Sequence, residues 1–289
     1  MRYAVMLVAV TLVLLLSACS SQLGYRFADT LVEWKLDDYV ELNEQQEQRV
    51  DTAITSLHYW HATSELPFYA EQLQQLRDQV ANKQLDEANL IAVYEQVFVA
   101  WQRMLNGLRP YALELLPDLT DAQVKQLMQK LDERQQEERD ELAEYDDSEL
   151  VQRTRKRAEK NARSWLGQLT PLQERLIRSW VTERIPTRAL WLDYNEKWQS
   201  TFQETLMIRH DTERFTSQLD MLMFEPQQLR SEQLSESIQT NQDATLSLIL
   251  KLEQSLTDRQ RRRVLAKLDG YIEDMRELAE HFRQQGPAN

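Results

Sequence analysis

A helix-start pattern that occurs four times constrains the fold of this chain more than any other feature. The stretches LNEQQ, LTDAQ, LTPLQ and LTDRQ begin at residues 42, 119, 169 and 256 and share the form Leu-(Thr/Asn)-x-x-Gln. A Thr or Asn at the N-cap accepts a hydrogen bond from the first helical turn, and a Gln three residues later reaches back to the N–H of the cap. The pattern therefore predicts four helices that each begin with this reciprocal arrangement, a capping box.

The three defining positions of each copy are the candidate cap residues: Leu42, Asn43 and Gln46; Leu119, Thr120 and Gln123; Leu169, Thr170 and Gln173; Leu256, Thr257 and Gln260. The cap positions, 43, 120, 170 and 257, are 77, 50 and 87 residues apart. Seven and eleven residues after every cap the chain is apolar, which predicts one buried stripe on each helix. The spacing is compatible with two related halves, about 25–165 and 166–289.

The composition favours helix throughout the chain. Five glycines and seven prolines in 289 residues are too few for a turn-rich β protein, and no stretch alternates apolar and polar residues as a strand does. We expect an all-α fold, a multi-helix bundle of about eight to ten helices. Helix breakers predict that one helix ends near Pro67 and another near residue 107, and an early helix carries Phe27, Leu31 and Trp34 on one face.

The N-terminus indicates an export signal. Arg2 supplies a positive charge, and residues 4–16 form an apolar run in which Thr11 is the only polar residue. Thirteen helical residues span about 20 Å, which is less than the roughly 30 Å of a bilayer core. We therefore predict a cleaved signal peptide over residues 1–18 rather than a membrane span.

Residues 16–19 resemble the lipobox of bacterial lipoproteins: Leu16, Ser17, Ala18 and Cys19, the only cysteine of the chain. In that family the cysteine thiol receives a diacylglycerol and the new N-terminus is acylated. The resemblance implies a covalent lipid on Cys19 and no other cofactor, a tether over 19–24 and an all-helical periplasmic domain over 25–289. Ser20, where an aspartate would retain such a protein in the inner membrane, implies the outer membrane. The alternative is a chance cysteine after an ordinary signal peptide.

The short tether predicts where the body begins. Six residues separate Cys19 from Tyr25, and an extended chain of that length reaches about 20 Å at most. We therefore expect Tyr25 and Phe27 to lie near the lipid headgroups.

Two family resemblances follow from these motifs. The four cap motifs resemble the LTxxQ signature of the Spy and CpxP periplasmic chaperones, which implies helix starts in a cradle-shaped, all-helical protein. The segment 25–73 resembles an uncharacterised family of proteobacterial lipoproteins, a domain of unknown function, which implies location and fold but no activity. The matching positions are Tyr25, Trp34, Asp37, Tyr39, Leu42, Gln46, Trp60, His61, Glu65, Leu66, Pro67 and Tyr69.

Charge and residue types exclude several functions. A net charge of −13 opposes nucleic-acid binding by the whole chain. His58 and His61 have a spacing that can share a metal, with Glu65 one turn further on, but packing among aromatic residues is the favoured interpretation because a third ligand is not apparent. No nucleophile, base and orienting group can be assembled from the sequence. We expect no metal and no enzymatic activity.

The region around residues 190–224 is rich in large apolar side chains. Trp191 and Trp198 lie seven residues apart on one predicted helix face, and Met221, Met223 and Phe224 follow in an MLMF run. Core packing is the favoured interpretation, and an apolar binding surface is the alternative. We expect a membrane-anchored, chaperone-like binding protein for unfolded or amphipathic protein clients. The competing hypothesis is a structural or assembly subunit of a cell-envelope complex, and the sequence leaves the oligomeric state open.

Overall fold

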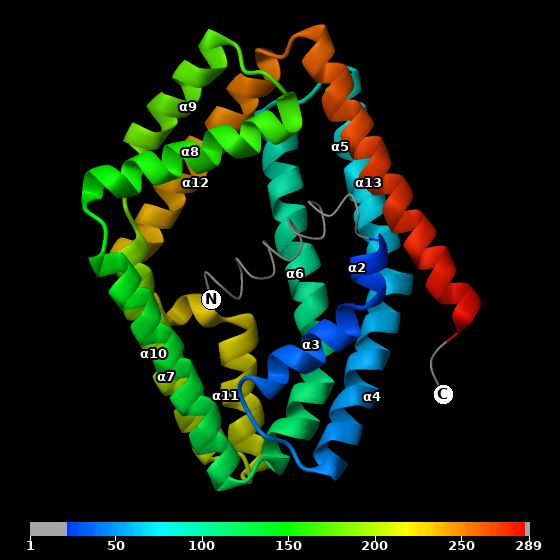
Figure 1. The fold of residues 1–289 in the computed structure, drawn as a ribbon, viewed down its shortest axis with the longest axis vertical. Helices are drawn as coiled ribbons and strands as arrows, with labels where there is room; N and C mark the ends of the chain where they lie inside the picture. Colours follow the sequence, from blue (N-terminus) through cyan, green and yellow to red (C-terminus); the bar gives the residue numbers. More distant parts are fainter. Residues whose placement is uncertain (1–21, 287–289) are drawn as a thin grey trace.

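The computed structural model describes residues 22–286, which form α-helices joined by short turns (Figure 1). This confirms the predicted all-α class, and no strand occurs within residues 22–286. The elements are α2 (Gln22–Arg26), α3 (Ala28–Asp37), α4 (Glu44–Trp60), a π-helix (His61–Glu65), α5 (Leu66–Ala81), α6 (Glu87–Leu115), a 3-10 turn (Leu116–Asp118), α7 (Asp121–Ala143), α8 (Asp147–Leu166), α9 (Pro171–Glu183), α10 (Arg188–Met207), α11 (Thr212–Phe224), a 3-10 turn (Pro226–Leu229), α12 (Glu232–Gln254) and α13 (Asp258–Gln285).

The helices form an elongated frame, and α6 runs along its long axis (Figure 1). One long side is built by α4, α5 and α13, with α13 packed along α5. The other side is built by α7 and α10, which pack on each other, and α8, α9 and α12 close the upper end. None of the helices in the described part of the chain is both long and apolar enough to cross a membrane.

Two predicted helix ends are wrong, and both involve a proline. The helix that begins at Glu44 does not end near Pro67 but passes through the π-helix into α5. Similarly, α6 does not end near residue 107 but continues to Leu115 with Pro110 inside it. A proline removes one helical hydrogen bond, and the helix tolerates this where tertiary contacts satisfy the carbonyl that is left over.

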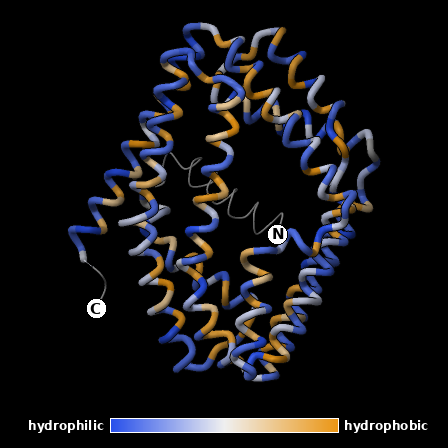
Figure 2. The backbone as a smooth tube through the Cα atoms, turned by 180° about the vertical axis from the view of Figure 1, so that it is seen from behind, coloured by the Kyte–Doolittle hydropathy of each residue, from blue (hydrophilic) through white to orange (hydrophobic). Residues whose placement is uncertain are grey.

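The interior consists of several small clusters rather than one central core. One cluster joins α2, the π-helix, α5, α6 and α13, and another joins α7, α10 and the loop before α4. Two more lie where α5, α6, α12 and α13 meet and where α8 meets α9. Figure 2 agrees, because apolar segments alternate with polar ones around the whole frame. Because each apolar cluster is small, we infer that polar interactions at the helix ends also contribute to the stability of the frame.

Candidate functional site

All four predicted motifs begin a helix with a capping box in the structure. The Asn43 and Thr120 side chains accept from the first turns of α4 and α7, and the Thr170 and Thr257 side chains do so for α9 and α13. In each case the Gln side chain accepts in return from the backbone N–H of the cap. Asp146 and Glu149 form a fifth capping box at the start of α8. The sequence pattern did not predict it, because it lacks the Leu and Gln of the other four.

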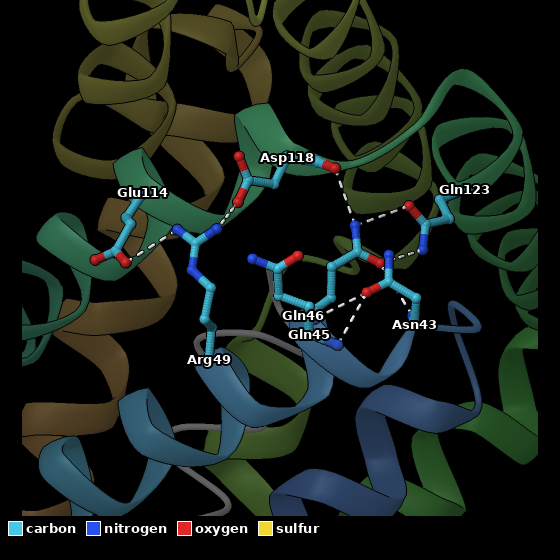
Figure 3. A network of polar contacts seen from close by, with 7 residues as sticks. All are labelled: Asn43, Gln45, Gln46, Arg49, Glu114, Asp118 and Gln123. Carbon is cyan, nitrogen blue, oxygen red and sulfur yellow. Dashed lines mark hydrogen bonds and ion pairs between the residues drawn. The ribbon is translucent and has the colours of Figure 1, made fainter.

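The first two motifs meet at the lower end of the frame, where α4 and α7 begin side by side (Figures 1 and 3). The Gln46 amide donates to the Gln123 side-chain oxygen at 3.1 Å, and Gln123 donates back at 2.6 Å. Each amide also donates to a backbone carbonyl of the other motif, that of Asp118 for Gln46 and that of Glu41 for Gln123. The glutamine of each capping box therefore joins two helix starts as well as closing its own.

The third and fourth motifs repeat this arrangement at the upper end, where α9 and α13 begin. Gln173 and Gln260 donate to each other at 3.0 and 2.9 Å. Gln173 also donates to the carbonyl of Ser255, and Gln260 donates to the carbonyl of Gln168. Both glutamines are buried, with 0 % and 4 % of their surface exposed.

One rule describes all four contacts. Each glutamine amide donates to the carbonyl of the residue that precedes the leucine of the partner motif, and the two glutamines of a pair bond each other. An isolated capping box does not need a partner, so the sequence could show the caps but not their pairing. The signal that was available is the shared Leu-(Thr/Asn)-x-x-Gln form itself, because ordinary N-caps do not require the glutamine.

Further contacts brace the lower pair. The Arg49 guanidinium bridges Glu114 and Asp118 at the end of α6 (Figure 3). On the other side, buried Arg209 donates to the carbonyl of Leu119 at 2.9 Å and pairs with Asp121. Arg49 thus ties α4 to the end of α6, and Arg209 ties the start of α7 to the turn after α10.

A second polar cluster surrounds the π-helix. Pro67 has no N–H to give to the carbonyl of Thr63, and the Arg283 guanidinium of α13 donates to that carbonyl instead at 2.9 Å. The outside donor thus satisfies the Thr63 carbonyl, and the chain continues through Pro67 into α5.

Tyr25 and His61 connect the N-terminal helix to this cluster. The Tyr25 hydroxyl lies 2.7 Å from His61 Nδ1, and its ring packs edge-on against His58 and Phe282. Desolvation by burial, with a smaller contribution from His58, lowers the pKa of His61 to about 4, so its imidazole is neutral at pH 7. Burial likewise raises the pKa of Tyr25. The Tyr25 ring is therefore part of the core and contacts protein side chains. The expectation that Tyr25 and Phe27 lie near the headgroups stays a prediction.

Glu65 is the most buried charge of the cluster. Its carboxylate is fully buried and accepts two hydrogen bonds from Arg103 of α6, at 2.7 and 2.6 Å. The same guanidinium lies over the Phe68 ring, 4.7 Å from its centre. This bidentate pair fixes α6 against the π-helix, and the long sequence separation hid it from sequence reasoning.

Gly107 permits another close contact between α4 and α6. A Cβ atom at this position would lie 2.6 Å from the indole ring of Trp60. Trp60 can pack against the α6 backbone only because residue 107 has no side chain.

Positions of the segment 25–73 that seemed unrelated in the sequence thus meet in space. Tyr25, His61, Glu65 and Pro67 lie at one place, where α2, α4, α5, α6 and α13 come together. A family model matches residues 38–235, which is more than half of the chain, and its description is a family of unknown function, DUF6279. The chain belongs to the DUF6279 family. Neither the curated proteins nor the solved structures contain a significant match.

The DUF6279 match contains the first three cap motifs and the π-helix but neither α3 nor α13. The partners of two central contacts, Tyr25 and Gln260, therefore lie outside the matched range. The pairing of the helix starts and the docking of α2 involve both matched and unmatched parts of the chain.

The predicted apolar surface of this DUF6279 protein is half-buried. Trp191 packs edge-on against Tyr194, and Trp198 stacks on Phe202 and donates to the carbonyl of Leu222. Met221, Met223 and Phe224 are half-buried on α11. The two tryptophans thus lie on α10 and the other three residues on α11, and each of the five is partly covered by protein.

Two other groups of large apolar side chains are exposed instead. One lies at the middle of α6 and includes Val97, Phe98 and Val99, which are 52, 51 and 42 % exposed. The other is α3 with the residue before it, where Phe27, Leu31 and Trp34 are 61, 55 and 66 % exposed. Amphipathic patterning could not identify them, because an apolar stripe normally indicates a buried face.

A polar groove of about 500 Å³ between α7 and α10 is lined mainly by Gln, Glu and Asp side chains, among them Asp132, Glu196 and Gln199. Within residues 22–286 no three His, Cys, Asp or Glu side chains gather as a metal site would require. The candidate lipidation site Cys19 and the lipobox residues Leu16, Ser17 and Ala18 lie outside the described residues.

Proposed function

We propose that this protein is a lipid-anchored, non-enzymatic binding protein of the bacterial cell envelope. Lipid on Cys19 holds it at the outer membrane, and the helical body faces the periplasm and holds unfolded or amphipathic protein segments. The exposed apolar middle of α6 is the observation that carries the proposal.

The exposure of α6 is unusual for a helix at the centre of a body. Val97, Phe98 and Val99 are consecutive, so they point in different directions around the helix axis, and all three are exposed. Contiguous exposed apolar surface of this kind marks interaction sites. An amphipathic helix or an extended apolar segment would bury these side chains.

The frame supports this interpretation because it holds α6 from both ends. Leu90 near the start and Leu105 beyond the middle are buried in α6, and Arg103 is fixed by Glu65. The paired helix starts brace both ends of the frame. The body can therefore keep the middle of α6 accessible without collapsing onto it.

The buried titratable groups favour binding over catalysis. The Glu65 carboxylate accepts hydrogen bonds from Arg103, and the His61 imidazole is hydrogen-bonded to the Tyr25 hydroxyl. Each of these two groups makes a structural bond within the core.

The test compares two exposed sites. The chain beginning at Ser20 is mixed near-equimolar with reduced insulin, whose B chain aggregates, and light scattering is followed. Phe98→Ser should lose most of the protection that the unmodified body gives, and Leu172→Ser, an exposed position on α9, should retain it. No protection by the unmodified body would refute client binding.

Crosslinking in cells separates this proposal from the assembly subunit. A photo-crosslinker placed at Phe98 should capture many envelope proteins if α6 holds clients. One dominant partner would instead indicate a fixed subunit of a cell-envelope complex.

A further inference from the structure

The amphipathic helix α3 exposes its large apolar side chains instead of burying them against the body. Its large apolar side chains are exposed, namely Leu31, Val32, Trp34 and Leu36 together with Phe27 just before the helix, and none of its residues is buried. Lys35 and Asp37 are exposed as well, whereas two other charged residues, Asp29 and Glu33, are half-buried against the body. An amphipathic helix on a water-soluble body normally has the opposite orientation.

Two acidic residues define the side that faces the body. The Asp29 carboxylate lies 3.7 Å from Nδ1 of His58, which is on α4. Glu33, half-buried, lies close enough to Asp51 of α4 for the two carboxylates to repel, and partial desolvation together with this repulsion raises the pKa of Glu33. The chain accepts a carboxylate repulsion on the inner side while it leaves a tryptophan in water on the outer side.

The location of α3 indicates what covers its outer side. Gln22, the first residue of α2, is only three positions after Cys19, and an extended chain of that length reaches about 10 Å. Gln22 is held to α13 through Asp274 and Glu277, and Tyr25 is held in the core. The body therefore cannot swing far from the anchor.

We propose that the outer side of α3, with Phe27, lies in the headgroup region of a zwitterionic phospholipid layer, beside the lipidated Cys19. The proposal rests on the lipid anchor proposed above. Trp and Phe side chains prefer this region, and helices of this kind bury their apolar side several ångströms deep. Figure 1 shows α3 continuing from α2 and crossing the frame diagonally.

Charge and size select this occupant. Asp37 and Asp38 are exposed at the end of α3, and the chain carries a net charge of −13, so an anionic lipid layer would repel it. A second protein copy is a poorer fit, because a ten-residue helix is about 15 Å long and offers far less than the roughly 800 Å² per partner of a stable interface.

The single cysteine makes a direct test available. Once its thiol carries lipid, a cysteine introduced elsewhere is the only free thiol of the full chain. Leu31→Cys and Leu172→Cys are each labelled with an environment-sensitive fluorophore in the lipidated protein in phosphatidylcholine vesicles. Lipids that carry a quenching group should remove most of the emission at position 31 and leave that at position 172, on α9, unchanged.

Each result decides the proposal. Equal exposure of positions 31 and 172 to water would overturn it. Blue-shifted emission at position 31 without lipid quenching would also overturn it, because a protein partner would then cover α3.

The anchor is tested separately by mass measurement of the N-terminal peptide. An unmodified Cys19 would refute the lipid anchor but not the proposed contact of α3 with lipid. In that case the same labels in a Cys19→Ser chain, added to phosphatidylcholine vesicles, show whether α3 enters the lipid unaided. If the emission at position 31 is not quenched there, the proposed contact of α3 with lipid is refuted as well.

Discussion

The side-chain amides of Gln173 and Gln260 bond each other in both directions, at 3.0 and 2.9 Å, across 87 residues of sequence. Each oxygen also accepts from the N–H of its own cap, Thr170 or Thr257. A helix N-terminus carries a partial positive charge and N–H groups without partners inside the helix. The bonds of the two glutamines and their caps let two such ends lie side by side in the interior. Gln46 and Gln123 solve the same problem at the other end of the frame.

Breaking the upper pair should destabilise the fold more than breaking the lower one. Gln260→Leu removes one partner of the buried Gln173 amide and takes from the Gln168 carbonyl and the Thr257 N–H their bonds to Gln260, and each buried group left unpaired costs about 1–3 kcal/mol. We expect the free energy of unfolding in urea to fall by about 2–4 kcal/mol. Gln46→Leu should cost less, because Gln46 is half-buried and water can replace its partners.

A double-mutant cycle checks that the two amides act together. Gln173→Leu and Gln260→Leu combined should cost clearly less than the sum of the two single changes, since the second change removes an amide that has already lost its bond to the other. Additive effects would show that the reciprocal bond contributes little.

Arg103→Met should destabilise the protein strongly. It leaves the Glu65 carboxylate, which is fully buried, without its two hydrogen bonds, and removing one partner of such a pair typically costs about 3–5 kcal/mol. Glu65→Leu in the Arg103→Met background should recover much of the loss, measured by urea unfolding. A double variant no more stable than Arg103→Met would contradict this account.

Stability should fall as the pH falls from about 6.5 towards 4. The pKa of His61 is about 4 in the folded chain and about 6.5 when unfolded, so the unfolded state binds more protons in this window and unfolding is favoured. We expect a loss on the order of 1–2 kcal/mol at pH 5 relative to pH 7.5.

His61→Gln provides the control for the pH dependence. It cannot take up a proton in this range, so the difference in unfolding free energy between pH 7.5 and pH 5 should shrink. An unchanged pH profile would assign the effect to other groups, such as His58, whose pKa burial also lowers.

Two glycine substitutions should have opposite effects. Gly107→Ala places a Cβ atom 2.6 Å from the Trp60 ring, and overpacking of this kind costs about 1–3 kcal/mol. Gly270→Ala in α13 meets no atom within 4 Å and should stabilise by about 0.5–1 kcal/mol, because alanine is the better helix former. Thermal unfolding of the two variants against the unmodified chain measures both. A melting temperature that rises for Gly107→Ala would refute the close contact with Trp60.

The sequence by itself determined the all-α class, the four capped helix starts and the apolar stripes behind them. These features depend on interactions within about four residues, such as the bonds between Thr170 and Gln173. The family resemblance also singled out Trp60, His61 and Glu65, although not what they contact.

Only the tertiary structure decided what each local feature faces. The pairing of Gln173 with Gln260, the Glu65–Arg103 bond and the rescue of the Thr63 carbonyl by Arg283 all join residues far apart in the chain. The sequence predicted that helices would end near Pro67 and residue 107, but both continue. At Pro67 a long-range partner, Arg283, supplies the missing hydrogen bond. Amphipathic patterning reports which side of a helix is apolar but not whether that side meets protein, water or lipid, so the outward orientation of Trp34 and the exposure of Phe98 depend on packing alone.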